Sequence, residues 1–151
     1  MRILFTAFNG KNNSSKILLD RINSENKLYL KNSFITSVNQ LEKELQKNEY
    51  DLVISFGQAP LDMDTIKIET IGKGNIEYKT EYNYALLENN LIKNNYIVIV
   101  SEDAGTYFCN NIYFNGLKYI KENNLNTKMI FIHIPSIDKI SNIDNLVSIF
   151  N

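Results

Sequence analysis

The chain contains one cysteine and one histidine, Cys109 and His133, and this pair of residue types can perform nucleophilic catalysis. The thiolate attacks a carbonyl carbon, and the imidazole takes the thiol proton. Gly105 predicts a tight turn ahead of Cys109, and Thr106 is a suitable cap for a helix over residues 106–123. Cys109 then falls in the first helical turn, where the helix dipole is expected to lower the pKa of its thiol.

His133 ends a strand-like apolar run at residues 128–134. In α/β folds the carboxyl ends of the strands carry the site, so a cysteine at a helix start and a histidine at a strand end are expected to meet. The two residue types alone leave another interpretation open. Single cysteines are often small buried hydrophobes, and a single histidine is often an ordinary core or surface residue.

Motifs around these residues narrow the choice. The cysteine lies in Ser-x-x-Ala-Gly-x-x-x-Cys-Asn at 101–110, and the histidine lies in Phe-Ile-His-Ile-Pro at 131–135. Upstream, Thr-Ala-Phe at 6–8 and Gly-Gln-Ala at 57–59 each follow a strand-like run. In this order, and with this interval between cysteine and histidine, the motifs resemble the pyroglutamyl peptidase I (pyrrolidone-carboxylate peptidase) family. These cysteine peptidases remove an N-terminal pyroglutamate.

The resemblance implies a catalytic triad. Cys109 matches the family's nucleophile and His133 its base. The segment Ile-Lys-Ile-Glu at 66–69 fits the family's Ile-x-x-Glu with a shift of one residue, so Glu69 is implied as the residue that orients His133. A carboxylate on one ring nitrogen fixes the tautomer and stabilises the imidazolium. Without the resemblance, Glu69 reads equally well as an exposed strand carboxylate. The backbone amide of Cys109 is a natural oxyanion donor at a helix start.

The resemblance also implies a substrate pocket. Phe8, Tyr107 and Phe108 match, by position, aromatic or apolar residues that line the pyroglutamate pocket of the family. A small flat lactam ring suits an apolar slot with a few polar anchors, and Gln58 and its loop are expected to supply them. Core packing is an alternative role for Phe8 and Phe108.

The chain is shorter than the family, and the losses affect the site. The loop after Phe8 is abbreviated, so a second phenylalanine of the family's pocket has no counterpart. The segment between Glu69 and Cys109 is short and lacks an arginine that assists the family's oxyanion hole. The only arginines of the chain are Arg2 and Arg21, and neither is placed to replace it.

Three hypotheses follow. The first is a peptidase that removes N-terminal pyroglutamate through the triad. The second is a thiol amidohydrolase that acts on another small amide, as the trimmed loops suggest. The third is a catalytically inactive family member that acts as a binding protein, as the missing arginine suggests.

The fold class follows from alternating patterns. Short apolar runs near 2–5, 28–30, 51–56, 96–100 and 128–134 predict strands, and the alternating run 66–71 predicts a half-exposed strand. Helical patterns near 14–23, after 36, at 84–94, at 106–123 and after 141 lie between or beside them. Residues 57–64 are expected to be a loop and 72–75 a turn. The alternation predicts a three-layer α/β/α sandwich with a mainly parallel twisted sheet. With 151 residues, a single domain over 1–151 is expected.

Composition limits the partners. The net charge is −1, which gives no reason to expect nucleic acid or an anionic membrane as a partner. A lone cysteine forms no internal disulfide and suits a reducing cytosol, so a cytoplasmic location is expected. No metal or other cofactor is expected from one histidine and one cysteine. The expected partner is a small peptide or amide substrate, and family members are commonly homo-oligomers.

Overall fold

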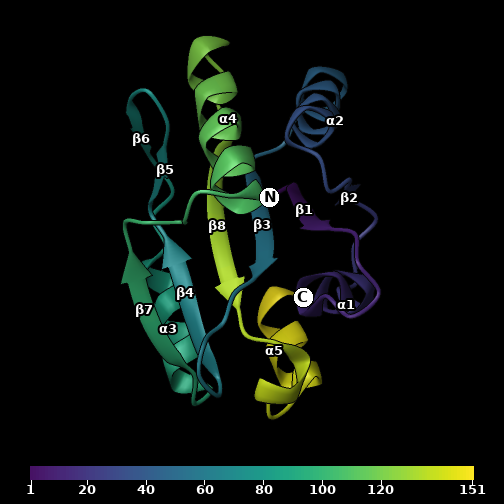
Figure 1. Cartoon of the computed structure of the whole chain (residues 1–151), viewed down its shortest axis with the longest axis vertical. Helices are drawn as coiled ribbons and strands as arrows, with labels where there is room; N and C mark the ends of the chain where they lie inside the picture. The colour runs from purple at the N-terminus through teal and green to yellow at the C-terminus, as the bar shows by residue number, and fades with distance from the viewer.

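Strands and helices alternate along the chain, and the computed structural model describes all residues 1–151 (Figure 1). The elements follow one another as β1 (Ile3–Phe8), α1 (Ser14–Arg21), β2 (Lys27–Leu30), α2 (Phe34–Lys47), β3 (Leu52–Gln58), β4 (Thr65–Glu69), β5 (Ile71–Lys73), β6 (Glu77–Lys79), α3 (Ala85–Lys93), β7 (Ile97–Ser101), α4 (Phe108–Glu122), β8 (Lys128–Ile134), the 3₁₀ turn η1 (Ile137–Lys139) and α5 (Ile143–Phe150). No helix is both long enough and apolar enough to span a bilayer.

Six of the strands form one sheet in the order β2-β1-β3-β8-β4-β7. Strands β2, β1, β3 and β8 are parallel, β4 pairs antiparallel with β8, and β7 pairs parallel with β4. The prediction of a mainly parallel sheet is therefore confirmed. The direction of β4 has a consequence for the site, because its carboxyl end points away from the edge where β1, β3 and β8 end.

Helices cover both faces of the sheet, as predicted for three layers. On one face α1, α3 and α5 contribute the fully buried Leu18, Leu91 and Leu146 to the core. On the other face α2 and α4 contribute Leu41 and Ile112. Figure 1 shows α3 behind β4 and β7, and α4 in front of the central strands.

Two predictions of strand exposure are wrong. Residues 66–71 are not one half-exposed strand, because β4 ends at Glu69 and only Lys67 within it is partly exposed. Glu69, which the alternating pattern places in solvent, is fully buried. The run 96–100 was expected to be a buried strand, yet β7 is the edge strand. Ile97 is 60% exposed and Ile99 43% exposed, because α4 does not reach them.

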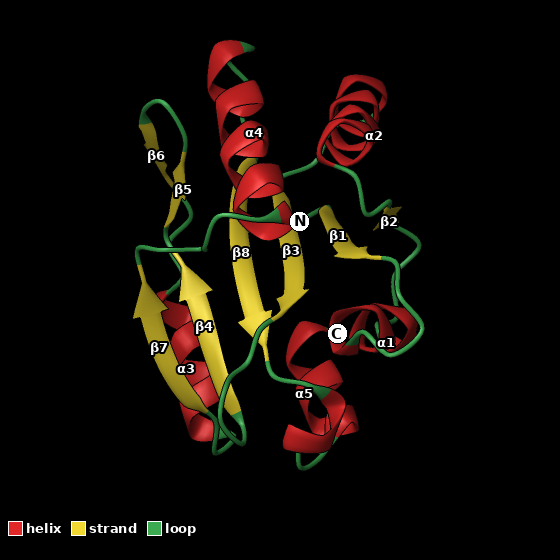
Figure 2. Cartoon of the chain, in the orientation of Figure 1, coloured by secondary structure: helices red, strands yellow, loops and turns green.

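The expected turn at 72–75 is part of a small hairpin of β5 and β6, which stands beside α4 and apart from the main sheet (Figure 2). At Gly72 the hairpin touches the backbone of α4, since a Cβ there would lie 2.7 Å from Phe114 Cα.

The expected loop at 57–64 begins later than predicted, because Gly57 and Gln58 continue β3. One helix start differs as well: Ser33 caps α2, since its hydroxyl accepts from the Thr36 amide at 3.1 Å. Asn142 caps α5, because its Oδ1 accepts from the Asn145 amide at 3.1 Å.

Candidate active site

Cys109 lies in the first turn of helix α4, as predicted, but the predicted start and cap of that helix are wrong. The helix begins at Phe108 after Tyr107, and neither Tyr107 nor Thr106 supplies a side-chain cap. Gly105 makes the tight turn before it, with a φ of 90°. The first amides of a helix have no acceptor within the helix. The N–H of Cys109 is therefore available to a negatively charged oxygen at this end of α4.

A glycine in β3 lets the thiol lie against the sheet. A Cβ at Gly57 would stand 2.6 Å from Cys109 Sγ and 2.9 Å from Phe131 Cζ, so a larger residue displaces the sulfur. Gly57 pairs with His133 across β3 and β8. The thiol thus lies above the strand next to the one that carries the histidine. The sequence prediction quoted Gly57 only as part of a motif and gave it no role.

Strand registers place the pocket residues in one row across the sheet. Ala7 pairs with Phe56, so the next residues, Phe8 and Gly57, are also neighbours. His133 follows on β8 and Lys67 on β4. The row is the floor of a cavity of about 530 Å³ between the sheet and the start of α4. The cavity is lined by Phe8, Gln58, Tyr107, Phe108, Cys109 and His133, all of them predicted, and by Gly57, Lys67 and Asp103 among others.

Glu69 lies on the same face of the sheet as this row, two residues beyond Lys67 on β4. It pairs with Phe131, two residues before His133 on β8, and side chains of alternate strand residues share a face. Its carboxylate therefore reaches the imidazole diagonally, and Glu69 Oε1 is 3.9 Å from His133 Nδ1. The distance is too long for a hydrogen bond but within ion-pair range once the ring is protonated. Glu69 is 0% exposed, and the alternative of an exposed strand carboxylate is wrong.

Three neighbours fix Glu69. Ser101 Oγ, on the adjacent β7, donates to Oε2 at 3.1 Å, and the Asp103 amide donates to that hydroxyl at 3.1 Å. Tyr113 on α4 donates its hydroxyl to the Glu69 carbonyl at 2.8 Å. Oε1 has no hydrogen-bond partner. A buried carboxylate oxygen is costly without a partner, so this oxygen is a ready acceptor for the N–H of the imidazole ring that it faces. The sequence alone did not reveal the roles of Ser101 and Tyr113. Ser101 could have been noticed, because it is the first residue of the motif that contains Cys109.

The expected lowering of the thiol pKa is wrong. Burial and, to a smaller extent, the negative charge of Glu69 raise the pKa of Cys109 to about 12. Desolvation of the thiolate thus outweighs the helix dipole. In the free protein at neutral pH the sulfur is a thiol, so a nucleophile forms only if a base removes its proton.

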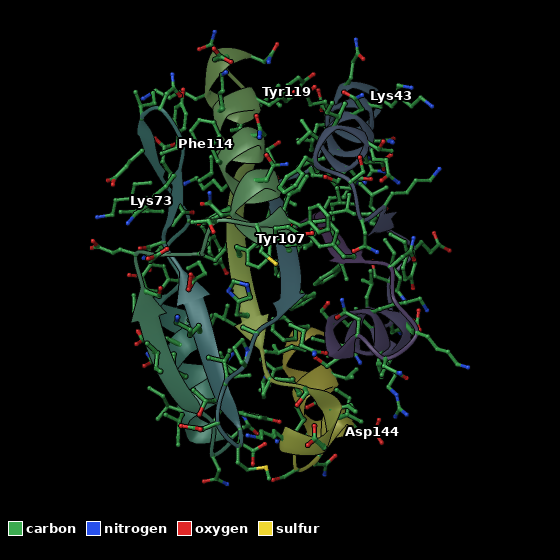
Figure 3. All side chains as sticks on the ribbon, viewed as in Figure 1. Lys43, Lys73, Tyr107, Phe114, Tyr119 and Asp144 are labelled. Atoms are coloured by element: carbon green, nitrogen blue, oxygen red, sulfur yellow. The ribbon has the colours of Figure 1, made fainter.

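One side of the cavity is aromatic. Phe8 and Phe108 stack with ring centroids 5.7 Å apart, and Tyr107 lies 4.2 Å from Phe108. Phe34, the first residue of α2, adds a ring 4.6 Å from Phe108 and 5.3 Å from Tyr107. Tyr107 is 63% exposed and lies at the foot of α4 (Figure 3). The sequence gave no signal for Phe34, because its contact with α4 depends on the packing of α2 beside α4.

The remaining predicted residues divide between structure and site. Gln58 lines the cavity, but its Oε1 accepts the Ser14 amide at 2.8 Å and holds the start of α1, which leaves its amide group for the cavity. Arg2 and Arg21 lie elsewhere, beside Glu49 and Asp144. The cation that does line the cavity is Lys67. No cluster of three or more His, Cys, Asp or Glu side chains is arranged to hold a metal ion.

Comparisons with known proteins agree with this arrangement. A family model for pyroglutamyl peptidase matches residues 69–148. A pyrrolidone-carboxylate peptidase of Caldanaerobacter subterraneus subsp. tengcongensis is 29% identical over 89% of this chain and 82% of the relative. A pyrrolidone-carboxylate peptidase of Brachyspira hyodysenteriae is 32% identical over 74% of this chain and 66% of the relative.

The same fold occurs in solved structures. Pyroglutamyl peptidase I from Bacillus amyloliquefaciens superposes with a TM-score of 0.88 at 20% identity, over 99% of this chain and 93% of that one. Pyrrolidone carboxyl peptidase from Thermococcus litoralis gives 0.79 at 21% identity, over 99% and 90%. At these identities the superpositions establish the fold alone, whereas the family model covers more than half of the chain. The chain therefore belongs to the pyroglutamyl peptidase family of cysteine peptidases.

Proposed function

We propose that this chain removes N-terminal pyroglutamate from peptides, with Cys109 as nucleophile, His133 as general base and acid, and Glu69 as the group that orients His133. One observation carries the proposal. The thiol and the imidazole line one cavity with an aromatic side, and a buried carboxylate oxygen without a hydrogen-bond partner faces Nδ1 of that imidazole at 3.9 Å.

The acylation step begins with a neutral thiol. With Nδ1 turned to Glu69, Nε2 of His133 takes the proton of Cys109 Sγ while the sulfur attacks the carbonyl carbon of pyroglutamate. The imidazolium is then paired with Glu69. The amide of Cys109 at the start of α4 donates to the developing oxyanion. The carbon–nitrogen bond breaks, the imidazolium gives its proton to the leaving amine, and a thioester remains on Cys109.

In deacylation His133 again takes and returns a proton, with water as the donor and the thiolate of Cys109 as the acceptor. A water molecule gives a proton to Nε2 of His133 and attacks the thioester carbonyl. The carbon–sulfur bond breaks, pyroglutamate leaves, and the proton returns to Sγ. Each proton taken by the ring is therefore returned within its own half-reaction. The aromatic rings of Phe8, Tyr107 and Phe108 offer the flat lactam an apolar contact surface.

The raised thiol pKa favours a second candidate, a family member that binds a ligand without catalysis. Such a protein needs no thiolate, and burial of Cys109 makes the thiolate costly. The two candidates differ over Glu69, because a binding protein gains nothing from a buried carboxylate directed at an imidazole.

The test compares the wild type with Cys109→Ser and Cys109→Ala on a fluorogenic pyroglutamyl amide under reducing conditions. We expect release of the fluorophore by the wild type and a loss of about 10³-fold or more in both variants. A prolyl amide, which lacks the ring carbonyl, serves as the control substrate. The absence of release by a folded, reduced wild type sinks the peptidase proposal and leaves another small amide or a binding role.

A further inference from the structure

Lys67 is a cation in the cavity that the proposed reaction does not use. It lines the cavity from β4, directly across the strand pair from His133, and it is partly buried. The ion pairs of the chain are Lys16 with Asp20, Arg21 with Asp144, and the His133–Glu69 pair, so no carboxylate lies within 4.0 Å of Lys67 Nζ. An ammonium group that is partly removed from water and has no carboxylate partner favours an anion.

The order of residues across the sheet indicates where an anion bound by Lys67 would lie. From the aromatic side the row runs Phe8, Gly57 with the thiol above it, His133 and then Lys67. Adjacent strands are about 4.8 Å apart, which is well within the reach of a lysine side chain. The lysine therefore lies on the opposite side of the histidine from the aromatic rings.

The chemistry gives the substrate a direction along this row. The pyroglutamyl ring occupies the aromatic side, and its carbonyl carbon meets the sulfur. The leaving nitrogen must come to His133, because the imidazolium gives it a proton. The residue that follows pyroglutamate therefore passes over His133 toward Lys67. In a dipeptide, the α-carboxylate of that residue is separated from the leaving nitrogen by a single carbon atom.

We propose that Lys67 binds the terminal carboxylate of the departing residue, so that the preferred substrates are pyroglutamyl dipeptides with a free C-terminus. This inference rests on the proposed function. A lysine–carboxylate hydrogen bond in a partly desolvated site is strong, and it discriminates against a neutral amide at the same position.

Two other charges bear on the inference. Asp103, which also lines the cavity, holds the Gly105 amide with its Oδ1 at 2.9 Å, and it opposes an incoming carboxylate. Asp103→Asn is therefore expected to increase the preference for a free carboxylate. His133 is assigned to proton transfer in the proposed reaction, so Lys67 is the group left to hold the carboxylate.

The experiment compares pyroglutamyl-alanine with pyroglutamyl-alaninamide, with release of alanine or alaninamide followed by an amine-reactive dye. For the wild type we expect kcat/KM for the free acid to exceed that for the amide by about tenfold or more. Lys67→Met should bring this ratio close to one, mainly by raising KM of the acid, and Lys67→Arg should retain most of it. Lys73→Met, an exposed lysine on β5 whose side chain points away from the cavity (Figure 3), should leave the ratio unchanged.

Two results overturn the inference while the proposed function stands: hydrolysis of both substrates with equal efficiency by the wild type, or an equal loss on both in Lys67→Met. The second result assigns Lys67 to the oxyanion instead. Calorimetric binding of the two dipeptides to Cys109→Ala separates the inference from catalysis. Tighter binding of the acid there, abolished by adding Lys67→Met, supports the role of Lys67 even if the wild type hydrolyses neither substrate.

Discussion

The two sides of the cavity are built in different ways. The catalytic polar side consists of His133 on β8, backed by the buried Glu69 on β4. The aromatic side consists of Phe8, Tyr107 and Phe108, backed by Phe34. Glu69 is 0% and His133 7% exposed, whereas Phe34 is 45% and Tyr107 63% exposed. Strand pairing and hydrogen bonds hold the polar side, but the outer aromatic rings rest on one another at the ends of α2 and α4.

This difference indicates a division of labour. Proton transfer depends on placement within a fraction of an ångström, which strands in the middle of a sheet supply. Apolar contact with a ring tolerates larger displacements, so exposed helix ends suffice. Changes on the polar side should therefore lower kcat steeply, while changes on the aromatic side should mainly raise KM.

The largest effect is expected from Glu69→Gln. The amide keeps the shape but cannot stabilise an imidazolium, so kcat should fall by about 10²- to 10⁴-fold. Steady-state kinetics on the fluorogenic amide measure it, and Glu77→Gln, an exposed strand glutamate on β6, is the matched control. A loss of less than about fivefold means that Glu69 does not act through His133.

Gly57→Ala comes next. The new Cβ meets Cys109 Sγ at 2.6 Å and Phe131 Cζ at 2.9 Å, so the sulfur has to move from its place beside His133. We expect kcat to fall about 100-fold and the free energy of unfolding to fall by about 1–3 kcal/mol. Urea denaturation of the Gly57→Ala/Cys109→Ala double variant checks the cause. If the sulfur causes the clash, Gly57→Ala should lower the free energy of unfolding less in the Cys109→Ala background than in the wild type. An equal loss in both backgrounds contradicts the clash with sulfur.

A smaller effect is expected on the aromatic side. Tyr107→Ala and Phe34→Ala each remove ring contacts worth about 0.5–1.5 kcal/mol, so KM should rise about 2- to 10-fold with a smaller change in kcat. Tyr119→Ala on the outer part of the same helix α4 is the control for helix stability (Figure 3). If kcat falls more than KM rises, the two sides of the cavity do not divide the work as proposed.

The smallest effect concerns the thiol itself. Because burial raises the pKa of Cys109 to about 12, its alkylation by iodoacetamide should still be accelerating above pH 10, without a plateau near pH 8.5. The charge of Glu69 raises this pKa, so Glu69→Gln should lower it and speed alkylation severalfold at pH 9. The same variant would then be more reactive and less active. Slower alkylation in Glu69→Gln would falsify the electrostatic coupling.

The sequence by itself determined the local parts of the site. The apolar run at 128–134 matches β8, and the helical spacing of Tyr113, Leu117 and Ile120 marks the buried face of α4. The turn at Gly105 and the place of Cys109 in the first helical turn were also readable. These features depend on residues that are close in the chain, so periodicity and turn chemistry are sufficient to predict them.

The tertiary structure decided the surroundings of those parts. Glu69 is buried because β4 runs antiparallel to β8 and brings its carboxyl end under α4, and no local pattern encodes strand direction. The thiol pKa rises because the sulfur packs over Gly57 between the sheet and the helix, which outweighs the dipole of its own helix. The antiparallel pairing of β4 with β8 also places Lys67 opposite His133, so that Lys67 faces the cavity. Burial and electrostatics are sums over neighbours in space, and only the folded chain specifies them.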